Sequence, residues 1–330
     1  MAFGGMVGVP TRRSGATDEQ VRLMAKVARM YHERGMRQSE IAAELHVSQP
    51  RVSRLLKRAV ETGVVRTTVN LPTGVHTDLE DELEALYGIS EAVIVDAGDE
   101  EEPLRALGGA AAVYLETTMI GGDDVGISSW SASLIAAVDA LRPWSNPVVS
   151  QVVQLVGGVG ESRVQLDATR LLTSFAQATG GAPIFLPAPG LLGSPEARDS
   201  LMADPAVEQV TSRWPRLTVA LVGIGTLEPS PLLRQSGNSI AVADQEALRT
   251  AGAVGDVCLR FFDEQGDLVP TELDKRVIGI TPDMLRTIPR RIAVAGGLRK
   301  VAAIRGAMRG RWINVLITDA RTARALVESA

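Results

Sequence analysis

The stretch HVSQPRVSRLLKRAVETG, residues 46–63, places four cations within eight positions of a chain whose formal net charge is −5. These cations are Arg51, Arg54, Lys57 and Arg58. Ser48 is a favourable helix N-cap, and a proline two residues later is tolerated in a first helical turn. Gly63 is a favourable residue just past a helix end. The stretch therefore predicts a short basic helix between Ser48 and Gly63.

Two further helical patterns precede the basic helix. Residues 18–34 repeat apolar side chains at helical spacing, and residues 39–45 predict a shorter helix with Ser39 as its N-cap. Three helices joined by short turns, the last one basic, are typical of a helix-turn-helix DNA-binding domain. The expected inward stripe of the third helix is Val52, Leu55, Leu56, Ala59 and Val60. The side chains left for DNA are Ser48, Gln49, Arg51, Ser53, Arg54, Lys57 and Arg58.

The outward side chains of the third helix predict different roles along its length. The N-terminal half is expected to enter the major groove, where arginine can bind guanine bidentately and glutamine can pair with adenine. Lys57 and Arg58 lie further along and are expected to contact phosphates. The alternative is the solvated face of an ordinary helix bundle. Because residues 1–71 carry a net charge of +6 and the remainder −11, we favour double-stranded operator DNA as the partner of this first part.

Length and composition limit the class of protein. A chain of 330 residues suggests two domains, and the single cysteine, Cys258, excludes an internal disulfide. No apolar run approaches the ~18 residues of a transmembrane helix, and the first residues lack the pattern of a signal peptide. We expect a soluble cytoplasmic protein with no membrane partner, in which residues 1–16 are a disordered lead-in.

The pattern changes from about residue 90 onward. Short aliphatic runs alternate with helical stretches, which predicts a parallel sheet covered on both faces. The expected strands lie at 92–96, 124–128, 151–157, 217–225, 291–297 and 313–319. The expected helices lie at 103–119, 132–141, 165–179, 298–309 and 319–328. The predicted fold class is therefore α/β: a small helical helix-turn-helix domain, followed by a Rossmann-like, mostly parallel α/β effector domain.

The expected domain organisation follows from these patterns. The helix-turn-helix domain covers residues 17–72, a helical connector covers 73–89, and the effector domain covers 90–330. Within the connector, the helix expected at residues 77–87 carries Leu79, Leu83 and Leu86 on one side. This leucine stripe can serve as a dimer contact, or it can pack on its own domain.

Five glycine- or serine-rich loops in the second part point to a ligand site. They lie at 126–133, 155–160, 222–226, 252–256 and 295–300. In open α/β sheets, ligands bind outside the carboxyl ends of the strands, and helix N-termini favour anions. One such loop alone is an ordinary tight turn. The five loops together, with serine or lysine in two of them, predict an anionic small-molecule site.

Catalytic and metal-binding patterns are sparse. His32, His46 and His76 all precede residue 77, so the second part of the chain holds no imidazole. The spacings typical of zinc sites, nucleophile elbows and Walker loops are not present. Asp167, Asp256 and Lys300 are the remaining candidates for acid–base chemistry. We therefore expect ligand binding rather than turnover, with no catalytic residue, metal or cofactor.

The sequence resembles the SorC family of sugar-binding transcriptional regulators over nearly its whole length. The resemblance rests on IAAELHVSQPRVSRLLKRAVETGVV (41–65), VVQLVGG (152–158), LVGIGT (221–226), GAVGDVCLRFFDEQG (252–266) and IPRRIAVAGGLRKVAAIRGAMRGRWINVLITD (288–319). It implies an effector domain similar to sugar-phosphate isomerases and deaminases. It also implies a phosphorylated sugar or polyol as effector, and homodimers or homotetramers on DNA.

The resemblance also implies an effector pocket. Its expected residues are Gly126, Ser128, Ser129, Ser133, Gly157, Gly158, Gly223, Gly225, Asp256 and Lys300. We expect Lys300 to hold the effector phosphate, with Ser129 or Ser133 as a neutral donor. The family loop often reads W-G-x-T-L, whereas residues 130–134 of this chain read WSASL, with Ser131 at the glycine position. The serine narrows the loop, which predicts a ligand different from the better-known sugar phosphates of the family. Two alternatives are an isomerase- or deaminase-like enzyme fused to a DNA-binding head, and a structural DNA-binding protein without ligand.

Overall fold

The computed structural model describes residues 18–65, 74–98, 103–160, 162–228, 234 and 240–330. The expected disordered lead-in, residues 1–16, and the expected domain boundary at residue 72 lie outside these ranges. The chain divides into two compact units, residues 1–71 and 72–330, which are described separately below.

The described part of the first unit, residues 18–65, contains three helices, as the sequence predicts. They are α1 (Asp18–His32), α2 (Gln38–Glu44) and α3 (Gln49–Glu61). Their apolar faces meet in one small core, which contains Val27, Met30, Ile41, Val52 and Leu56. This core explains why a unit with so many exposed charged side chains can fold compactly.

Two details of this unit differ from the sequence prediction. The N-cap of α2 is Arg37 rather than Ser39, because the carboxylate of Glu40 accepts a hydrogen bond from the Arg37 backbone N–H at 2.8 Å. Val60 is 55% exposed and does not belong to the inward stripe of α3. It lies one residue past the buried Ala59, and one residue rotates a side chain by about 100° around a helix.

The second unit is built on a seven-stranded sheet in which every pairing is parallel. Its strands are β1 (Glu91–Val95), β2 (Asp123–Ile127), β3 (Val149–Gln154), β4 (Ala182–Ile184), β5 (Val219–Val222), β9 (Arg290–Val294) and β10 (Val315–Asp319). Their order across the sheet is β1-β10-β9-β5-β2-β3-β4. All residues of β5 and β10 are buried, which is characteristic of strands covered on both faces. The predicted Rossmann-like α/β class is confirmed.

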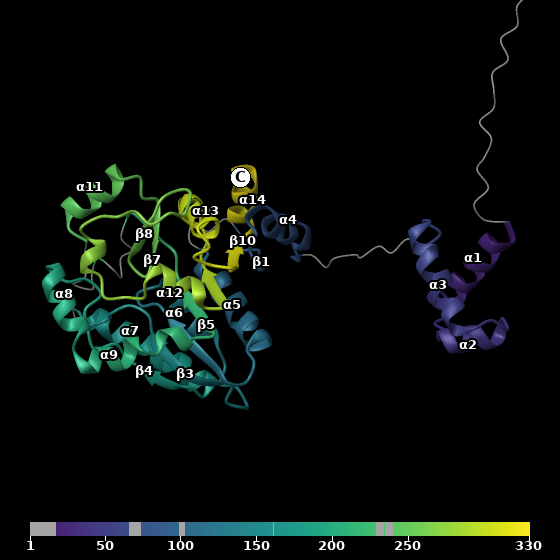
Figure 1. Ribbon diagram of the computed structural model, residues 1–330, viewed down its shortest axis with the longest axis horizontal. Coiled ribbons are helices and arrows are strands. Elements are labelled where there is room, and N and C mark those ends of the chain that lie inside the picture. Colours follow the sequence, from purple (N-terminus) through teal and green to yellow (C-terminus); the bar gives the residue numbers. More distant parts are fainter. Residues whose placement is uncertain (1–17, 66–73, 99–102, 161, 229–233, 235–239) are drawn as a thin grey trace, which may run out of the picture. The chain divides into compact units, whose positions relative to one another are not determined.

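Helices cover both faces of this sheet, as Figure 1 shows. One apolar cluster joins the strands to α5 (Leu104–Thr118), α6 (Ala132–Ala140) and α7 (Ser162–Thr179). Another contains buried residues of α4 (Thr77–Tyr87), α13 (Val301–Arg309) and α14 (Ala320–Glu328). Alternate residues along the strands therefore contribute to different clusters, as the period of a strand requires.

Several elements were not predicted. A second, antiparallel sheet has the order β6-β7-β8, and the sequence expected residues 252–256 only as a loop after a strand. Its strands are β6 (Gly225–Thr226), β7 (Gly255–Val257) and β8 (Arg260–Phe262). The additional helices are α8 (Pro195–Met202), α9 (Pro205–Thr211), α11 (Val242–Thr250) and α12 (Pro282–Thr287), with 3-10 turns η1 (Trp214–Arg216) and η2 (Asp274–Arg276). Strand β4 was not predicted either. The helix predicted at 298–309 is divided into a 3-10 turn, η3 (Leu298–Lys300), and α13.

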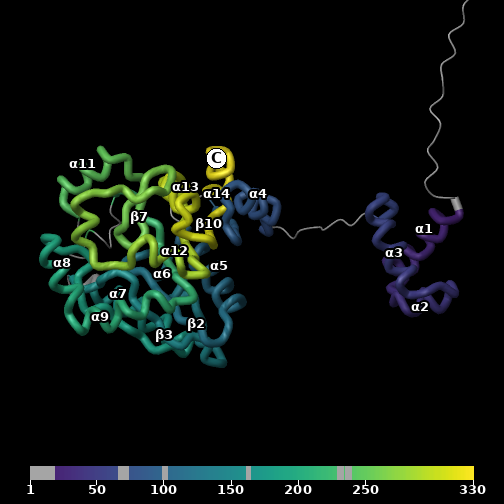
Figure 2. Tube along the Cα trace, in the orientation of Figure 1, coloured from purple at the N-terminus to yellow at the C-terminus, as the bar shows by residue number. Residues whose placement is uncertain are grey.

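The connector helix α4 is part of the second unit. Leu83 is fully buried in the effector core and Leu79 packs against it, whereas Leu86 is 48% exposed. The carboxylates of Glu80 and Glu84 accept hydrogen bonds from backbone N–H groups of β1, both at 2.9 Å. Helix α4 lies beside α14 and β1 (Figures 1 and 2). Of the two roles left open for its leucine stripe, packing on its own domain accounts for Leu79 and Leu83.

Candidate DNA-binding surface and effector site

Helix α3 presents every residue predicted to contact DNA. Ser48, Gln49, Arg51, Ser53, Arg54, Lys57 and Arg58 are all exposed. The opposite face of the helix buries Val52, Leu56 and Ala59. This division follows from helical spacing alone, and it leaves a continuous polar and basic surface along the helix.

The local geometry of α3 suits a helix that must approach another surface. Ser48 is its N-cap, and the turn before it contains His46 at φ +51°, a left-handed value that residues other than glycine rarely adopt. The Arg54 Nε donates to the Pro50 carbonyl oxygen at 3.3 Å, so this side chain lies along its own helix. Lys57 is 4.0 Å from Glu61, and such an exposed pair holds the lysine only weakly. Both side chains can therefore be redirected at small cost.

A cavity of about 700 Å³ lies at the carboxyl ends of the parallel strands of the second unit. It is lined by residues that follow β2, β5 and β9. Strand β2 continues to β3 on one side of the sheet, and β5 continues to β9 on the other side. The strand order therefore reverses between β2 and β5, and ligand sites of open α/β sheets lie at such a switch point.

Seven of the ten predicted effector residues line this cavity. They are Ser128, Ser129, Ser133, Gly223, Gly225, Asp256 and Lys300. Gly126, Gly157 and Gly158 do not line it, and each makes room for neighbouring groups. A Cβ atom on Gly126 would overlap the side chains of Leu155 and Leu217. A Cβ atom on Gly157 would overlap the backbone at residues 188–189, and one on Gly158 would overlap the Gln154 amide.

The two cavity glycines of the β5 loop make room for polar side chains. A Cβ atom on Gly223 would overlap the Ser131 hydroxyl, and one on Gly225 would overlap the Asp256 carboxylate. The Ser131 Oγ accepts a hydrogen bond from the Leu134 N–H at 3.3 Å and thereby caps α6. Serine at position 131 thus fills space above Gly223, and the N-terminus of α6 lies at the cavity.

The three predicted serines differ in how their hydroxyl groups are used. The Ser129 hydroxyl donates to the Val156 carbonyl oxygen at 3.2 Å and accepts from Gln154 Nε2 at 2.8 Å. The Ser128 Oγ accepts from the Gly223 N–H at 3.2 Å, so its own hydrogen remains for another acceptor. The Ser133 hydroxyl makes no hydrogen bond with any residue that the structure describes. Ser133 and Ser128 are thus better placed than Ser129 to donate to a ligand.

Three cations line the cavity. The sequence predicted Lys300, which is the N-cap of α13 and donates from Nζ to the Ile224 carbonyl oxygen at 2.8 Å. It did not predict Arg234 and Arg299, both of which are exposed and line the same cavity. Arg299 directly precedes Lys300 in the loop at 295–300. Counting every cation of this loop, rather than Lys300 alone, could have identified Arg299 as a site residue from the sequence. These cations favour a ligand that carries negative charge.

Two acidic residues, Glu228 and Asp256, also belong to the described lining of the cavity. Asp256 is the one that the sequence predicted. Its Oδ2 atom accepts from the Leu259 N–H at 3.0 Å. Burial raises the pKa of this carboxyl to about 6, against the opposing effects of the Leu259 hydrogen bond and the charge of Lys300. The carboxylate is therefore held in place through Oδ2, in a half-buried position that disfavours its charged form.

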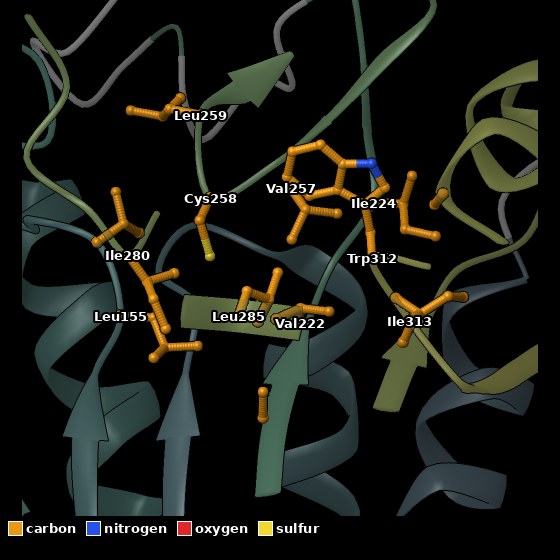
Figure 3. Packing of buried hydrophobic residues seen from close by; sticks show 14 of the residues in the cluster. Leu155, Val222, Ile224, Val257, Cys258, Leu259, Ile280, Leu285, Trp312 and Ile313 are labelled. Carbon is orange, nitrogen blue, oxygen red and sulfur yellow. The ribbon is translucent and has the colours of Figure 1, made fainter. Parts of the chain in front are cut away.

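The hairpin turn between β7 and β8 forms another wall of the cavity. Its central residues, Cys258 and Leu259, are buried and have φ values of +55° and +63°. Turns of this kind favour asparagine and glycine, so packing and the Asp256 hydrogen bond must hold this one in place. Figure 3 shows the Cys258 sulfur pointing toward the strand ends. Burial raises the pKa of this thiol, which makes it an inert side chain.

Trp130 contributes an apolar wall and a polar atom. Its backbone φ is +58°, its side chain is 8% exposed, and its ring lines the cavity. The indole Nε1 is buried and has no hydrogen-bond partner among the described residues. Leu104 and Leu107 of α5 add further apolar groups to the lining. The cavity can therefore hold a ligand that combines polar groups with an apolar carbon skeleton.

Metal clusters and membrane-spanning helices are both absent from the part of the chain that the structure describes. Among the residues that the structure describes, no group of three or more His, Cys, Asp or Glu side chains could hold a metal ion. Within the same residues, no helix has the length and apolar character to cross a membrane.

Known protein families match each of the two units. The family described as "Putative sugar-binding domain" matches residues 72–328, and that described as "Helix-turn-helix domain" matches residues 16–79. The deoxyribonucleoside regulator of Bacillus subtilis is 35% identical over 94% of this chain and 98% of its own length. The sorbitol operon regulator of Klebsiella pneumoniae is 34% identical over 94% of this chain and 99% of its own length.

Solved structures give the same result. The crystal structure of the full-length sorbitol operon regulator SorC from Klebsiella pneumoniae matches with a TM-score of 0.70 and 31% identity. The match covers 94% of this chain and 100% of that one. The similar proteins named here are transcriptional regulators rather than enzymes. The chain belongs to the SorC family and is a DNA-binding transcriptional regulator with a sugar-binding domain.

Proposed function

We propose that the effector of this regulator is a small phosphorylated sugar or polyol that binds in the cavity at the switch point. The observation that carries the proposal is that Lys300, Arg234 and Arg299 line the same cavity as the N-terminus of α6. The first N–H groups of a helix have no intrahelical partner, and they favour anions. Cations and a helix N-terminus around one cavity suit a phosphate better than a neutral group.

The remaining polar groups suit the hydroxyl groups of a sugar. In the proposed complex, Ser133 donates to the phosphate, and the Asp256 carboxylate accepts hydrogen bonds from hydroxyl groups. Charge-assisted hydrogen bonds of this type are the stronger ones, and a sugar offers several donors. Trp130 and Leu107 pack against the carbon skeleton. Lys300 exchanges its bond to the Ile224 carbonyl oxygen for one to the phosphate.

On the DNA side, we propose that Gln49, Arg51, Ser53 and Arg54 read base edges in a major groove, with Ser48, Lys57 and Arg58 near the backbone. One helix-turn-helix covers too little DNA for high specificity, so the protein acts in the cytoplasm as a homodimer or homotetramer. The effector favours one arrangement of the subunits, and this arrangement sets the spacing of the two α3 helices on an operator.

The experiment that tests the effector class uses matched pairs of ligands. Five- and six-carbon sugar phosphates and the same sugars without phosphate are titrated into the full-length protein by calorimetry. We expect binding by at least one phosphorylated sugar or polyol, and at least about 10-fold weaker binding by its unphosphorylated counterpart. Mass spectrometry of any ligand retained during purification identifies the natural compound. Equal affinity for both members of every pair contradicts the proposal.

A further inference from the structure

Asp319 is a buried carboxylate at the end of β10, and the proposed effector site does not use it. Its Oδ1 atom accepts hydrogen bonds from the backbone N–H groups of Arg321 at 3.1 Å and Thr322 at 2.9 Å. These two bonds make Asp319 the N-cap of α14, which is a common role of aspartate. Capping therefore occupies one of the two carboxylate oxygens and leaves the other for a different task.

The second oxygen, Oδ2, reaches the loop that follows the neighbouring strand β9. It accepts a hydrogen bond from the Gly297 N–H at 2.9 Å. The hydroxyl group of Thr322, a fully buried residue, donates to the same oxygen at 2.6 Å and accepts from the Gly297 N–H at 2.8 Å. We call these two side chains, with the Gly297 N–H between them, the Asp319–Thr322 clamp.

The clamp acts where residues 296–300 leave the sheet. Gly297 has φ +94° and ψ 137°, a conformation that glycine adopts without the strain that a Cβ atom would cause. A Cβ atom on Gly296 would overlap Oδ2 of Asp319. The Gly297 carbonyl oxygen then accepts from the Lys300 N–H at 2.9 Å, at the 3-10 turn η3. The clamp and the two glycines together therefore set the course of this loop.

The loop contributes to the effector cavity, whereas the clamp stays behind it. Four of the five residues at 296–300 belong to the described lining, and two of these four are the cations Arg299 and Lys300. Neither Asp319 nor Thr322 belongs to that lining. The clamp can therefore affect a ligand only through the loop that it holds. A loop that is already fixed loses less conformational entropy when a ligand binds.

We propose that Asp319 and Thr322 are positioning residues of the effector site. Their clamp on Gly297 fixes residues 296–300 in the course that presents Arg299 and Lys300 to an anionic ligand. This inference rests on the proposed effector site. The alternative is that Asp319 serves only as the N-cap of α14. Capping requires Oδ1 alone, whereas the clamp also requires Oδ2 and the Thr322 hydroxyl.

The first test is Thr322→Val in the full-length protein, because valine removes the hydroxyl at nearly constant volume. The probe is the panel sugar phosphate with the highest affinity for wild type, or inorganic phosphate if no sugar phosphate binds. We expect its dissociation constant to rise by about 3- to 10-fold, the scale of one lost hydrogen bond. Thr322→Ser keeps the hydroxyl and should bind the probe like wild type.

Asp319→Asn separates the clamp from the cap. Asparagine caps a helix as well as aspartate does, but its side chain has only one acceptor oxygen. With that oxygen on the N–H groups of α14, the NH₂ group opposes the Gly297 N–H, and probe binding should weaken by at least about 10-fold. Asp204→Asn is the matched control and should bind like wild type. Asp204 caps α9 through the Ala206 N–H at 2.8 Å and does not line the cavity.

Two readouts distinguish positioning from a general loss of stability. Thr322→Val should weaken probe binding less in a Lys300→Ala background than in wild type, because the clamp acts through the loop cations. In ligand-free protein, amide hydrogen exchange of residues 296–300 should become faster in Thr322→Val and Asp319→Asn. Equal weakening in both backgrounds would overturn the proposal, as would wild-type affinity in both single variants.

Failure of the proposed effector class is seen separately. It appears as wild-type protein that binds neither the sugar phosphates nor inorganic phosphate. The hydrogen exchange of residues 296–300 then decides the clamp alone: faster exchange in both variants supports it, and unchanged exchange overturns it.

Discussion

The surface of α3 and the effector cavity differ in how their residues are distributed along the chain. The predicted DNA contacts all lie within residues 48–58 of one helix, whereas the cavity is lined by residues from Pro103 to Ala302. On a single helix, spacing alone decides which side chains are exposed. In a cavity, the sheet order and the chain between strands decide which side chains meet. A local surface can therefore be read from sequence far more completely than an assembled one.

The largest expected effect concerns the assembled site. Lys300→Ala should weaken effector binding by roughly 10- to 150-fold, because a hydrogen-bonded charge contact contributes about 1.5–3 kcal/mol. Titration calorimetry with the sugar phosphate that binds wild type measures this change. Lys275→Ala is the matched control, since Lys275 is exposed and paired with Glu272 at 2.7 Å, outside the cavity lining. An unchanged dissociation constant in Lys300→Ala would remove this lysine from the site.

The cavity could be predicted only in part, because its lining comes from segments that lie far apart in the sequence. The glycine-rich loops after the strands lie at the carboxyl end of the sheet, and seven of the ten residues predicted for the effector pocket line the cavity there. Gly126, Gly157 and Gly158 lie in the same predicted loops, but at these positions neighbouring protein groups occupy the space that a side chain would need. The sequence alone does not show whether a glycine makes room for a ligand or for another part of the protein. Arg234 belongs to the Pro-, Ser- and Gly-containing stretch PSPLLRQSGNS (229–239), which does not directly follow a predicted strand, so only the fold could reveal that Arg234 lines the cavity.

The fold shows the same limit. Long aliphatic strands were predicted because burial on both faces leaves a continuous apolar run. Strands β6, β7 and β8 are two or three residues long, too short for a periodic pattern. The turn at Cys258–Leu259 was also unpredictable, because neither residue favours a positive φ, and distant packing imposes it. This turn nevertheless forms one wall of the effector cavity.

The next effect tests the local surface. Arg54→Ala should weaken binding to the specific operator by about 1–3 kcal/mol, the scale of one bidentate base contact. The operator is first obtained by selection from random-sequence DNA, and binding is measured by fluorescence anisotropy. Arg22→Ala, an exposed arginine on α1, is the control and should bind nearly like wild type. If Arg54→Ala binds its operator as well as wild type does, the wrong face of α3 has been assigned to the groove.

A smaller effect concerns Asp256, for which protein stability and effector binding are expected to change in opposite directions. The folded pKa of Asp256, about 6, lies above the unfolded value of about 3.9, so the folded protein loses stability as pH rises between them. Asp256→Asn removes this cost and keeps an acceptor for the Leu259 N–H. The free energy of unfolding of the effector unit should rise by about 1–2 kcal/mol above pH 6, and this gain should shrink toward pH 4.

The measurement for Asp256→Asn is urea denaturation at pH 4.5 and pH 7.5, with sugar-phosphate titration alongside. The proposed hydroxyl contact predicts weaker effector binding in the same variant that gains stability. A variant with lower stability at pH 7.5 would show that the ionised carboxylate stabilises the fold. Equal effector affinity would exclude Asp256 from ligand contact.

The smallest effect lies on α3, one turn beyond the residues expected to read bases. The side chain of Lys57 is 81% exposed and only loosely paired with Glu61, so it is free to approach a phosphate. Each neutralised phosphate releases counterions, and losing one contact should reduce the slope of log affinity against log salt by about one. We therefore expect Lys57→Ala to weaken operator and random DNA alike, as measured by anisotropy at several salt concentrations. Lys57→Arg keeps the charge and should keep the slope. A loss confined to the operator would instead assign Lys57 to a base, and the base-reading part of α3 would then extend at least one turn further than its spacing predicts.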